Sequence, residues 1–366
     1  MRHREAFAAA RTMGYLERRG PAGPRIGPEM RAEARLSIER VRPALRPGSL
    51  ITVFGGSGFV GRHVVQALAR KGYRVRVAVR RPNEALFVKT TGDVGQVEPV
   101  QANIRDTRSV RAALEGADAV VNLVGILQES GSQRFETVHA AGADRIAREA
   151  RAAGIGIFVH LSAIGADEAS PSVYARSKAL GEAVVRQHVP TAAILRPSII
   201  FGPEDDFFNR FAAMARLSLA LPLIGGGKTR FQPVYVKDVA AAVVRALESG
   251  AADGKVVELG GPEVYTFRQL MELVLREIGR KRILLPLPFW LARLMATLLQ
   301  FVPGAPLTVD QVKLLRRDNV VSEAAAAEGR TLAALAIAPT APEAILPVYL
   351  GRFRRRGQFD RLRMAE

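Results

Sequence analysis

The chain has 366 residues, 48% of them apolar, and a formal net charge of +18. This length and apolar fraction suit one large α/β unit with a second lobe, or two domains. The absence of cysteine excludes disulfides, thiolate metal sites and cysteine nucleophiles, and the histidines show no ligand spacing, so we expect no metal.

Residues 1–48 are rich in arginine, proline and glycine and show little apolar periodicity. We interpret them as a basic, disordered extension, or as residues upstream of a true start at Met30. A mitochondrial transit peptide is the alternative, but acidic residues such as Glu5 and Glu17 count against it. The basic charge could attract nucleic acid or an anionic membrane, yet no nucleic-acid-binding motif accompanies it, so we expect no nucleic acid partner.

The segment Ile51–Arg70, ITVFGGSGFVGRHVVQALAR, predicts a strand, a tight glycine turn and the start of a helix. Gly55 allows a sharp turn, Gly58 allows the backbone to approach a pyrophosphate, and Gly61 allows the helix to pack closely. The first helical turn offers free N–H groups and a positive dipole end to phosphates. The residues expected to bind a dinucleotide here are Gly55, Ser57, Gly58, Phe59, Val60 and Gly61.

Short apolar strands alternate with helices beyond this motif. The spacing predicts strands at Arg74–Val79, Val97–Val100, Ala117–Val124, Ile157–Leu161 and Ala192–Leu195, and helices at Thr107–Glu115, Phe135–Ala153 and Ser172–Gln187. This alternation predicts an α/β fold with a Rossmann-like, doubly wound parallel sheet. Right-handed crossovers then place the carboxyl ends of the strands at one edge, where ligands bind.

The pattern loosens after Gly202. The expected elements there are a helix over Asp206–Ser218, a strand over Phe231–Val236 and a helix over Asp238–Leu247. We therefore expect four parts: an extension at 1–48, an NAD(P)-binding Rossmann domain at 49–201 with a return segment near 231–250, a smaller C-terminal α+β lobe for substrate or partner at 202–356, and a tail at 357–366.

The run Pro288–Val302 contains one charge, Arg293, and predicts an amphipathic helix that is too short and too interrupted to span a membrane. Two uses remain open. The helix either packs within the protein or lies against a membrane surface or a partner.

The end of the second strand decides between the two nicotinamide cofactors. An acidic residue there would bind the ribose 2′-hydroxyl, but the chain has Arg80 and Arg81, which suit a 2′-phosphate. We therefore expect NADP(H) to be preferred over NAD(H). Further candidate cofactor contacts are expected where the third and fourth strands end, at Asn103, Ile104, Leu123, Val124 and Gly125.

Tyr174 and Lys178 are spaced four residues apart on a predicted helix, so both side chains share one face. A nearby ammonium lowers the pKa of a phenol, and the tyrosine can then exchange a proton while a nicotinamide exchanges hydride. Ser162, at the end of the preceding strand, could hold the same substrate oxygen. These three residues are the catalytic candidates, and Tyr174 and Lys178 are also expected to contact the cofactor.

These residues together resemble the extended or atypical branch of the short-chain dehydrogenase/reductase superfamily. The motifs that carry the resemblance are GGSGFVG (Gly55–Gly61), YARSK (Tyr174–Lys178), LRPSIIFGP (Leu195–Pro203) and QPVYVKDVA (Gln232–Ala240). The chain is more similar still to the nucleotide-binding accessory subunit family of respiratory complex I and its bacterial relatives. The segments concerned are IIFGPEDDFFNRFA (Ile199–Ala212) and PLTVDQVKLLRRDNVV (Pro306–Val321).

The resemblance covers residues 49–356 and adds Pro197, Ser198 and Ile199 to the expected cofactor contacts. It implies a tightly held NADPH with a structural role, complex I subunits as partners, and a place on the cytoplasmic or matrix side near the membrane. The alternative is a free NAD(P)-dependent oxidoreductase, epimerase or dehydratase that uses Tyr174 and Lys178. The sequence leaves turnover, substrate and oligomeric state open.

Overall fold

The computed structural model describes residues 44–299 and 307–355. Most of the expected N-terminal extension and all of the expected C-terminal tail lie outside the described residues, as does the end of the run Pro288–Val302.

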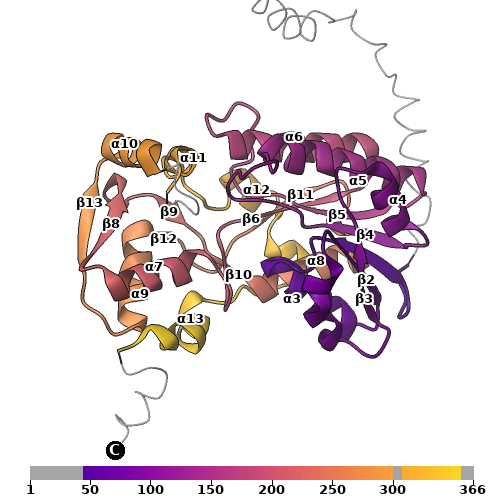
Figure 1. Ribbon diagram of the computed structural model, residues 1–366, viewed down its shortest axis with the longest axis horizontal. Helices are drawn as coiled ribbons and strands as arrows, with labels where there is room; N and C mark the ends of the chain where they lie inside the picture. Colours follow the sequence, from indigo (N-terminus) through magenta and orange to yellow (C-terminus); the bar gives the residue numbers. More distant parts are fainter. Residues whose placement is uncertain (1–43, 300–306, 356–366) are drawn as a thin grey trace, which may run out of the picture. The chain divides into compact units, whose positions relative to one another are not determined.

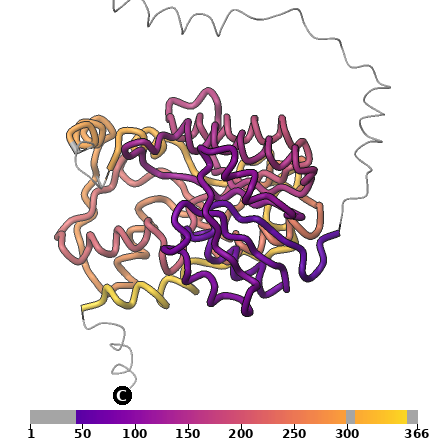
Figure 2. Tube along the Cα trace, turned by 45° about the vertical axis from the view of Figure 1, so that its right-hand side comes forward, coloured from indigo at the N-terminus to yellow at the C-terminus, as the bar shows by residue number. Residues whose placement is uncertain are grey.

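Seven strands form one parallel sheet in the order β11-β6-β5-β4-β1-β2-β3 (Figure 1). The strands are β1 (Leu50–Phe54), β2 (Arg74–Val79), β3 (Val97–Gln101), β4 (Ala119–Asn122), β5 (Ile157–Leu161), β6 (Ala193–Pro197) and β11 (Val256–Leu259). The main helices beside them are α3 (Phe59–Arg70), α4 (Thr107–Leu114), α5 (Gly142–Ala152), α6 (Val173–His188) and α8 (Val236–Ser249). Helices α3 and α8 cover one face, and α4, α5 and α6 cover the other (Figures 1 and 2). This arrangement confirms the predicted Rossmann-like sheet.

The side chains of neighbouring β1 residues pack on opposite faces of the sheet. Val53 packs with residues of α3 and α8, whereas Phe54 packs with residues of α4, α5 and α6, and both side chains are fully buried. Successive side chains of a strand point to opposite faces, so a strand covered on both sides must be apolar throughout. That is why the central strands appear in the sequence as short, continuous apolar runs.

Most of the remaining elements form a smaller lobe beside the sheet (Figure 1). Its strands are β7 (Ile200–Phe201), β8 (Ala220–Ile224), β9 (Arg230–Phe231), β10 (Val234–Tyr235), β12 (Tyr265–Thr266) and β13 (Ile283–Leu287). Its helices are α7 (Phe207–Leu217), α9 (Phe267–Glu277), α10 (Phe289–Leu299), α11 (Val309–Leu314) and α13 (Pro342–Leu350). Helix α12 (Glu323–Ala327) lies beside β11 of the main sheet, where the N–H of Ser322 donates to Glu258 (Figure 1). A cluster that includes Phe208, Leu221 and Leu270 forms its core. Strands β8 and β13 pair in parallel and carry α10 at one end.

Three local details differ from the expectations. The helix expected over Phe135–Ala153 begins with a π-helical turn, Glu136–Ala141, before α5. The expected strand Phe231–Val236 is divided into β9 and β10 because Gln232 and Pro233 interrupt the pairing, and α8 begins at Val236. Strand β11 comes from the range expected to form the smaller lobe, yet it pairs with β6 at the edge of the main sheet.

Within the described residues, no helix is both long enough and apolar enough to cross a membrane.

Candidate nucleotide-binding and active site

The glycine turn after β1 has the geometry that the sequence predicts. Gly55 adopts a left-handed conformation with φ of +79°, and the N–H of Gly58 donates to its carbonyl oxygen at 3.1 Å. A Cβ on Gly61 would lie 2.3 Å from that same oxygen, so only glycine allows α3 to begin so close to the turn. Gly58 is the N-cap, and no side chain in the part of the chain that the structure describes caps this end of α3. The exposed helix dipole and N–H groups therefore fit a pyrophosphate.

The turn packs against the end of β4. A Cβ on Gly55 would lie 3.2 Å from both the carbonyl carbon of Leu123 and the nitrogen of Val124. A Cβ on Gly125 would lie 3.3 Å from Nζ of Lys178. The structure thus brings the glycine turn, the expected contacts at Leu123–Gly125 and the candidate lysine into one continuous region.

The arginines after β2 differ from each other. Arg81 is exposed and pairs with Glu84 at 2.9 Å, whereas Arg80 is exposed and pairs with no carboxylate of the described residues. Arg62, in the first turn of α3, lies over the ring of Phe87 with its guanidinium carbon 4.9 Å from the centroid. The guanidinium groups of Arg62, Arg80 and Arg81 therefore follow β1 and β2 at the edge where the cofactor is expected.

The side chains of Asn103 and Ile104, which follow β3, contact other parts of the protein. The side-chain oxygen of Asn103 accepts the N–H of Arg105 at 3.1 Å, which closes a turn. The side chain of Ile104 lies against Gly142 at the start of α5, where its Cδ1 would be 2.6 Å from a Cβ. Contact of either residue with a nucleotide stays a prediction.

Tyr174 belongs to an aromatic cluster that the sequence analysis did not identify. The rings of Phe135 and His139 stack with centroids 5.6 Å apart, and Tyr174 meets both edge-on at 5.7 and 5.4 Å. His139 lies in the π-helical turn, which projects its ring toward α6. A carbonyl oxygen of His139 would lie 2.4 Å from a Cβ on Gly181, so this glycine lets α6 pack against the turn.

The hydrogen bonds of His139 fix its tautomer. The hydroxyl of Ser177 donates to the carbonyl of Tyr174 at 2.8 Å, so Nδ1–H of His139 must donate to that hydroxyl, also at 2.8 Å. Its Nε2 accepts the N–H of Ile126 at 3.0 Å. Burial, followed by the charge of Lys178, lowers the pKa of His139 to about 2. The ring is therefore neutral and serves as a fixed brace beside Tyr174.

Lys178 is buried, and its Nζ donates to the carbonyl of Leu161 at 3.2 Å. Burial lowers the pKa of Lys178 to about 8, against the opposing charge of Glu182. Burial also raises the pKa of Tyr174 to about 12, and no hydrogen bond joins these two described side chains. The sequence predicts that Lys178 lowers the pKa of Tyr174; in the protein alone, desolvation of the phenol outweighs that effect.

Ser162 is drawn into a buried ion network. Its hydroxyl donates to Glu182, which in turn accepts two hydrogen bonds from Arg196 at 2.8 and 2.7 Å. The Glu182 side chain is 1% exposed. The hydroxyl proton of Ser162 is thus committed to a carboxylate of α6, and its role toward a substrate oxygen stays a prediction.

Two residues of the C-terminal segment fasten the site from outside the Rossmann half. Asp310 of α11 caps α6 by accepting from the hydroxyl of Ser172 at 2.7 Å and from the N–H of Tyr174 at 3.1 Å. Asn319 accepts from the hydroxyl of Ser198 at 2.7 Å and the N–H of Ile199 at 3.0 Å. Both lie in the run Pro306–Val321, but nothing local in that run indicates which distant groups they bind. Pro197, the third expected contact here, ends β6.

Residues 51–260 match the family described as NAD dependent epimerase/dehydratase. The mitochondrial NADH dehydrogenase [ubiquinone] 1 alpha subcomplex subunit 9 of Arabidopsis thaliana is 36% identical over 327 residues, which cover 86% of this chain and 77% of the relative. The Mus musculus subunit of the same name is 37% identical over 277 residues, covering 75% and 73%. A ceramide reductase of Caulobacter vibrioides is 33% identical over 242 residues, covering 65% and 74%.

Solved structures share the fold. The NADPH-dependent quinone oxidoreductase QOR2 of Escherichia coli superposes with a TM-score of 0.63 at 18% identity, covering 82% of this chain and 99% of that one. Nicotinamide dinucleotide binding follows from the family and from the glycine turn. The chain belongs to the NAD dependent epimerase/dehydratase family and, within it, to the group that includes the alpha subcomplex subunit 9 of NADH dehydrogenase.

Proposed function

We propose that this chain is an NADP(H)-binding accessory protein of the respiratory NADH:quinone oxidoreductase and that its cofactor is mainly structural. One observation carries the proposal: the chain is 36% identical to the Arabidopsis subunit over 327 residues, an alignment that extends well beyond the family match at 51–260. The C-terminal lobe, which would form contacts particular to an assembly, is therefore included in the likeness.

The state of the catalytic candidates supports a structural cofactor. A bound nicotinamide dinucleotide would supply hydride transfer, and this chain would have to supply the accompanying proton transfer. Burial holds the pKa of Tyr174 near 12, and the hydroxyl of Ser162 is engaged by Glu182. A phenol with so high a pKa is a poor base at neutral pH. The region is better suited to hold a dinucleotide than to turn it over.

The direct test is the release of bound nucleotide. The protein is purified gently and denatured, and the released nucleotide is identified and counted; a second sample is first exposed to carbonyl compounds. We expect stoichiometric NADPH that neither exchanges nor becomes oxidised. An empty or freely exchanging site would contradict the structural role, and purification without any respiratory subunit would contradict the association.

The preference for NADP(H) is proposed from Arg80. Its guanidinium has no carboxylate partner among the described residues, so it is free to pair with a 2′-phosphate, whereas Arg81 is already paired with Glu84. Arg80→Ala is expected to lower the ratio of NADP to NAD affinity roughly tenfold, as the loss of a charge-assisted hydrogen bond implies. Arg81→Ala is the matched control and should change the ratio less. Equal weakening of both cofactors would remove the basis for the preference.

We further propose that the protein is peripheral to a membrane and contacts it through α10. In a bacterium this would be the cytoplasmic face of the inner membrane, and in a mitochondrion the matrix face. The support comes from α10 itself, which exposes Trp290 (68%) and Leu298 (68%). Aromatic and aliphatic side chains beside basic residues are typical of helices that lie in a membrane interface.

A free oxidoreductase, epimerase or dehydratase is the second candidate. The intact Tyr174–Lys178 pair favours it, as does the ceramide reductase relative, which is named as an enzyme. Loss of turnover in Tyr174→Phe with retained nucleotide binding would establish this alternative. A substrate that leaves the bound cofactor oxidised must be found first.

A further inference from the structure

Helix α10 presents the opposite polarity to that expected of a helix on a water-soluble surface. Its small residues Ala292 and Ala296 are buried, while Trp290, Leu294 and Leu298, also spaced four apart, are 68%, 52% and 68% exposed. Helices normally bury their large apolar residues and expose polar ones. The large apolar stripe of α10 therefore faces outward, with Met295 (40%) beside it.

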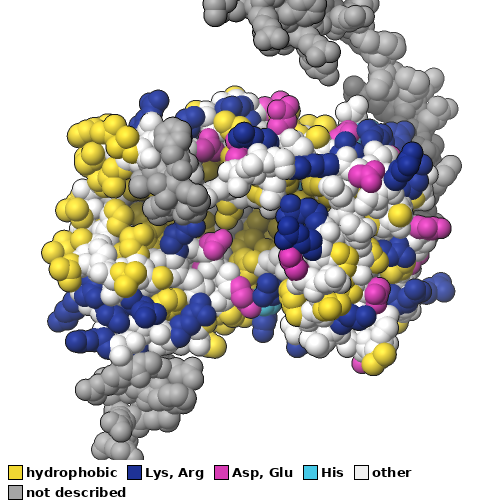
Figure 3. Space-filling view, viewed as in Figure 1, with side chains coloured by type: hydrophobic (Ala, Val, Ile, Leu, Met, Phe, Trp, Pro, Cys, Tyr) yellow, Lys and Arg dark blue, Asp and Glu magenta, His cyan; other side chains and the backbone are white. Residues whose placement is uncertain are grey.

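The neighbouring strand extends this apolar surface. Ile283 and Leu285 of β13 are 67% and 53% exposed, and their spacing of two places them on one face of the strand. Apolar side chains gather over α10 and β13 at the left edge of the molecule (Figure 3). Contiguous exposed apolar surface of this kind marks a contact with a partner or a membrane.

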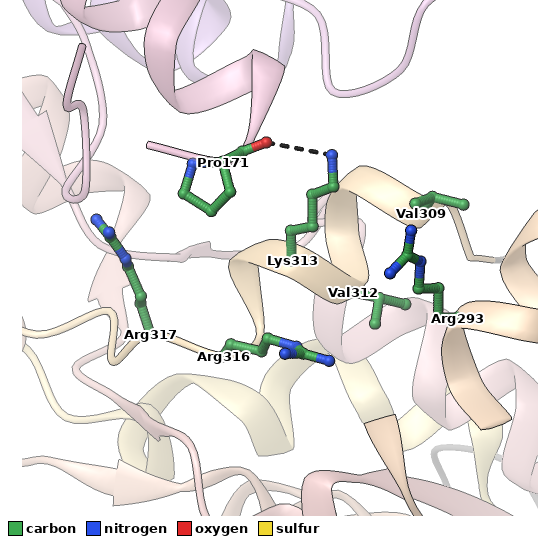
Figure 4. Close-up of a pocket in the computed structure, with 7 residues that line it drawn as sticks. All are labelled: Pro171, Arg293, Val309, Val312, Lys313, Arg316 and Arg317. Atoms are coloured by element: carbon green, nitrogen blue, oxygen red, sulfur yellow. Dashed lines mark hydrogen bonds between the residues drawn. The ribbon is translucent and has the colours of Figure 1, made fainter. Parts of the chain in front are cut away.

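A basic cavity lies beside α10, which contributes Arg293 to its lining. It has a volume of about 400 Å³ and lies between α10, α11 and the residues before α6. All the charged residues that line it in the described part of the chain are basic: Arg293, Lys313, Arg316 and Arg317 (Figure 4).

Most of this charge has no acidic partner. Arg317 pairs with Asp167 at 2.9 Å. Lys313 donates to the carbonyl of Pro171 at 3.2 Å, and the guanidinium of Arg316 lies 5.1 Å from the ring centroid of Phe289. Among the described residues, no carboxylate pairs with Arg293, Lys313 or Arg316. Three cations thus converge on a cavity without local neutralisation.

The chemistry of the two features points to one occupant. Guanidinium and ammonium groups bind phosphate strongly, and a negatively charged bilayer surface attracts basic residues close to it. The apolar stripe suits the acyl region of the same bilayer. A soluble phosphate would use the cavity but would leave the stripe on α10 and β13 unexplained.

We propose that the cavity is a binding site for the phosphate headgroup of an anionic phospholipid, and that α10 enters the membrane interface beside it. This inference rests on the membrane contact proposed above for α10. Arg293 and Arg316 bind the phosphate oxygens, and Lys313 adds a third positive charge. The site makes membrane contact selective for anionic lipid rather than merely apolar.

The test is flotation of the full chain with vesicles of phosphatidylcholine alone or mixed with phosphatidylglycerol. The triple variant Arg293→Gln, Lys313→Gln, Arg316→Gln should lose roughly 100-fold in partitioning to the mixed vesicles, because each basic residue near the surface contributes about fivefold. Binding to pure phosphatidylcholine should change little. Arg293→Gln alone removes no hydrogen bond to another described residue. Its partitioning to the mixed vesicles should fall about fivefold, so it tests the site even if the triple variant misfolds.

The matched control removes three exposed arginines of the Rossmann half, as Arg74→Gln, Arg108→Gln, Arg151→Gln, for the same change in net charge. Equal losses of vesicle partitioning in the control and the triple variant would show that only net charge matters and would overturn the headgroup site. Stabilisation by inorganic phosphate without vesicle binding would assign the cavity to a soluble phosphate and also overturn it.

A second variant distinguishes the headgroup site from the membrane contact of α10. Leu294→Glu, Leu298→Glu should abolish binding to both kinds of vesicle, because it alters the apolar stripe and leaves the cavity cations in place. If wild type binds both vesicles equally and only this variant fails, the membrane contact of α10 stands and the headgroup site is wrong. If wild type binds neither, both fail, and the nucleotide-release experiment still decides the cofactor proposal.

Discussion

The two charged regions of this molecule differ in whether their charged side chains are paired. In the Rossmann half, Lys178 and Glu182 are buried and each has a defined partner, with Arg196 in bidentate contact with Glu182. In the C-terminal lobe, Arg293, Lys313 and Arg316 converge on a cavity with no carboxylate partner among the described residues. Buried charges must be compensated within the protein, whereas uncompensated surface charges are available to an external ligand. The charges of the first region are compensated within the fold, whereas those of the second are available to a partner.

The largest expected effect tests this contrast on two ion pairs. Glu182→Gln leaves Arg196 without its bidentate carboxylate and should lower the free energy of unfolding by about 3 kcal/mol, as is typical when a buried pair is broken. Asp167→Asn, which removes the partner of Arg317 at the edge of the cavity, should have little effect because both side chains are exposed. Chemical denaturation of both variants measures the difference, and equal losses would contradict it.

A close backbone approach gives the next largest effect. Gly61→Ala places a Cβ 2.3 Å from the Gly55 oxygen, so the turn must open or α3 must move. We expect the free energy of unfolding to fall by about 3 kcal/mol, which is at the upper end for overpacking, and bound nucleotide to be lost. Gly156→Ala is the control, because nothing lies within 4 Å of its Cβ position and its φ is not left-handed. Retention of stoichiometric nucleotide in Gly61→Ala would show that the turn does not hold the pyrophosphate.

A buried histidine of the Rossmann half predicts that the free energy of unfolding depends on pH. His160 lies in β5, where Nδ1 contacts Asn122 at 3.2 Å and Nε2 has no hydrogen-bond partner among the described residues. Burial, followed by the charge of Lys178, lowers its pKa to about 3 from 6.5. Between these two values the unfolded chain binds a proton that the folded protein does not, so stability falls as pH drops through this range.

The size of that effect can be isolated by substitution. From pH 6.5 to 5, His160 alone should remove about 2 kcal/mol of stability, at about 1.4 kcal/mol per pH unit. His160→Gln should show a correspondingly smaller loss over the same range, measured by denaturation at each pH. An identical pH dependence in wild type and variant would show that His160 becomes protonated without unfolding.

The sequence predicts the Rossmann half well because its signals are local. The glycine turn, the apolar strands and the Tyr174–Lys178 spacing are each recognised within a few residues of sequence. The structure brings the glycine turn and Lys178 into one region where the strands end. The aromatic brace around Tyr174 is not predictable in this way, because it depends on a π-helical turn that brings His139 against α6. Asp310 and Asn319 act across more than a hundred residues. Their partners become visible only when the chain is folded.

The same limit applies to α10. Its sequence predicts an amphipathic helix but cannot say which stripe faces the protein, because alanine and leucine are both apolar. The structure shows that the alanines face inward. Periodicity identifies a helix with unequal faces, and only packing decides which face is free.

The smallest expected effect follows from this orientation. Leu294→Gln should change the free energy of unfolding by less than about 0.5 kcal/mol, because the side chain is 52% exposed and surface substitutions rarely cost more. Ala296→Leu, on the buried stripe, should cost about 1 to 3 kcal/mol by overpacking. Thermal and chemical denaturation compare the two variants. If the glutamine variant were the less stable one, the leucine stripe would belong to the protein's own core and could not serve a membrane.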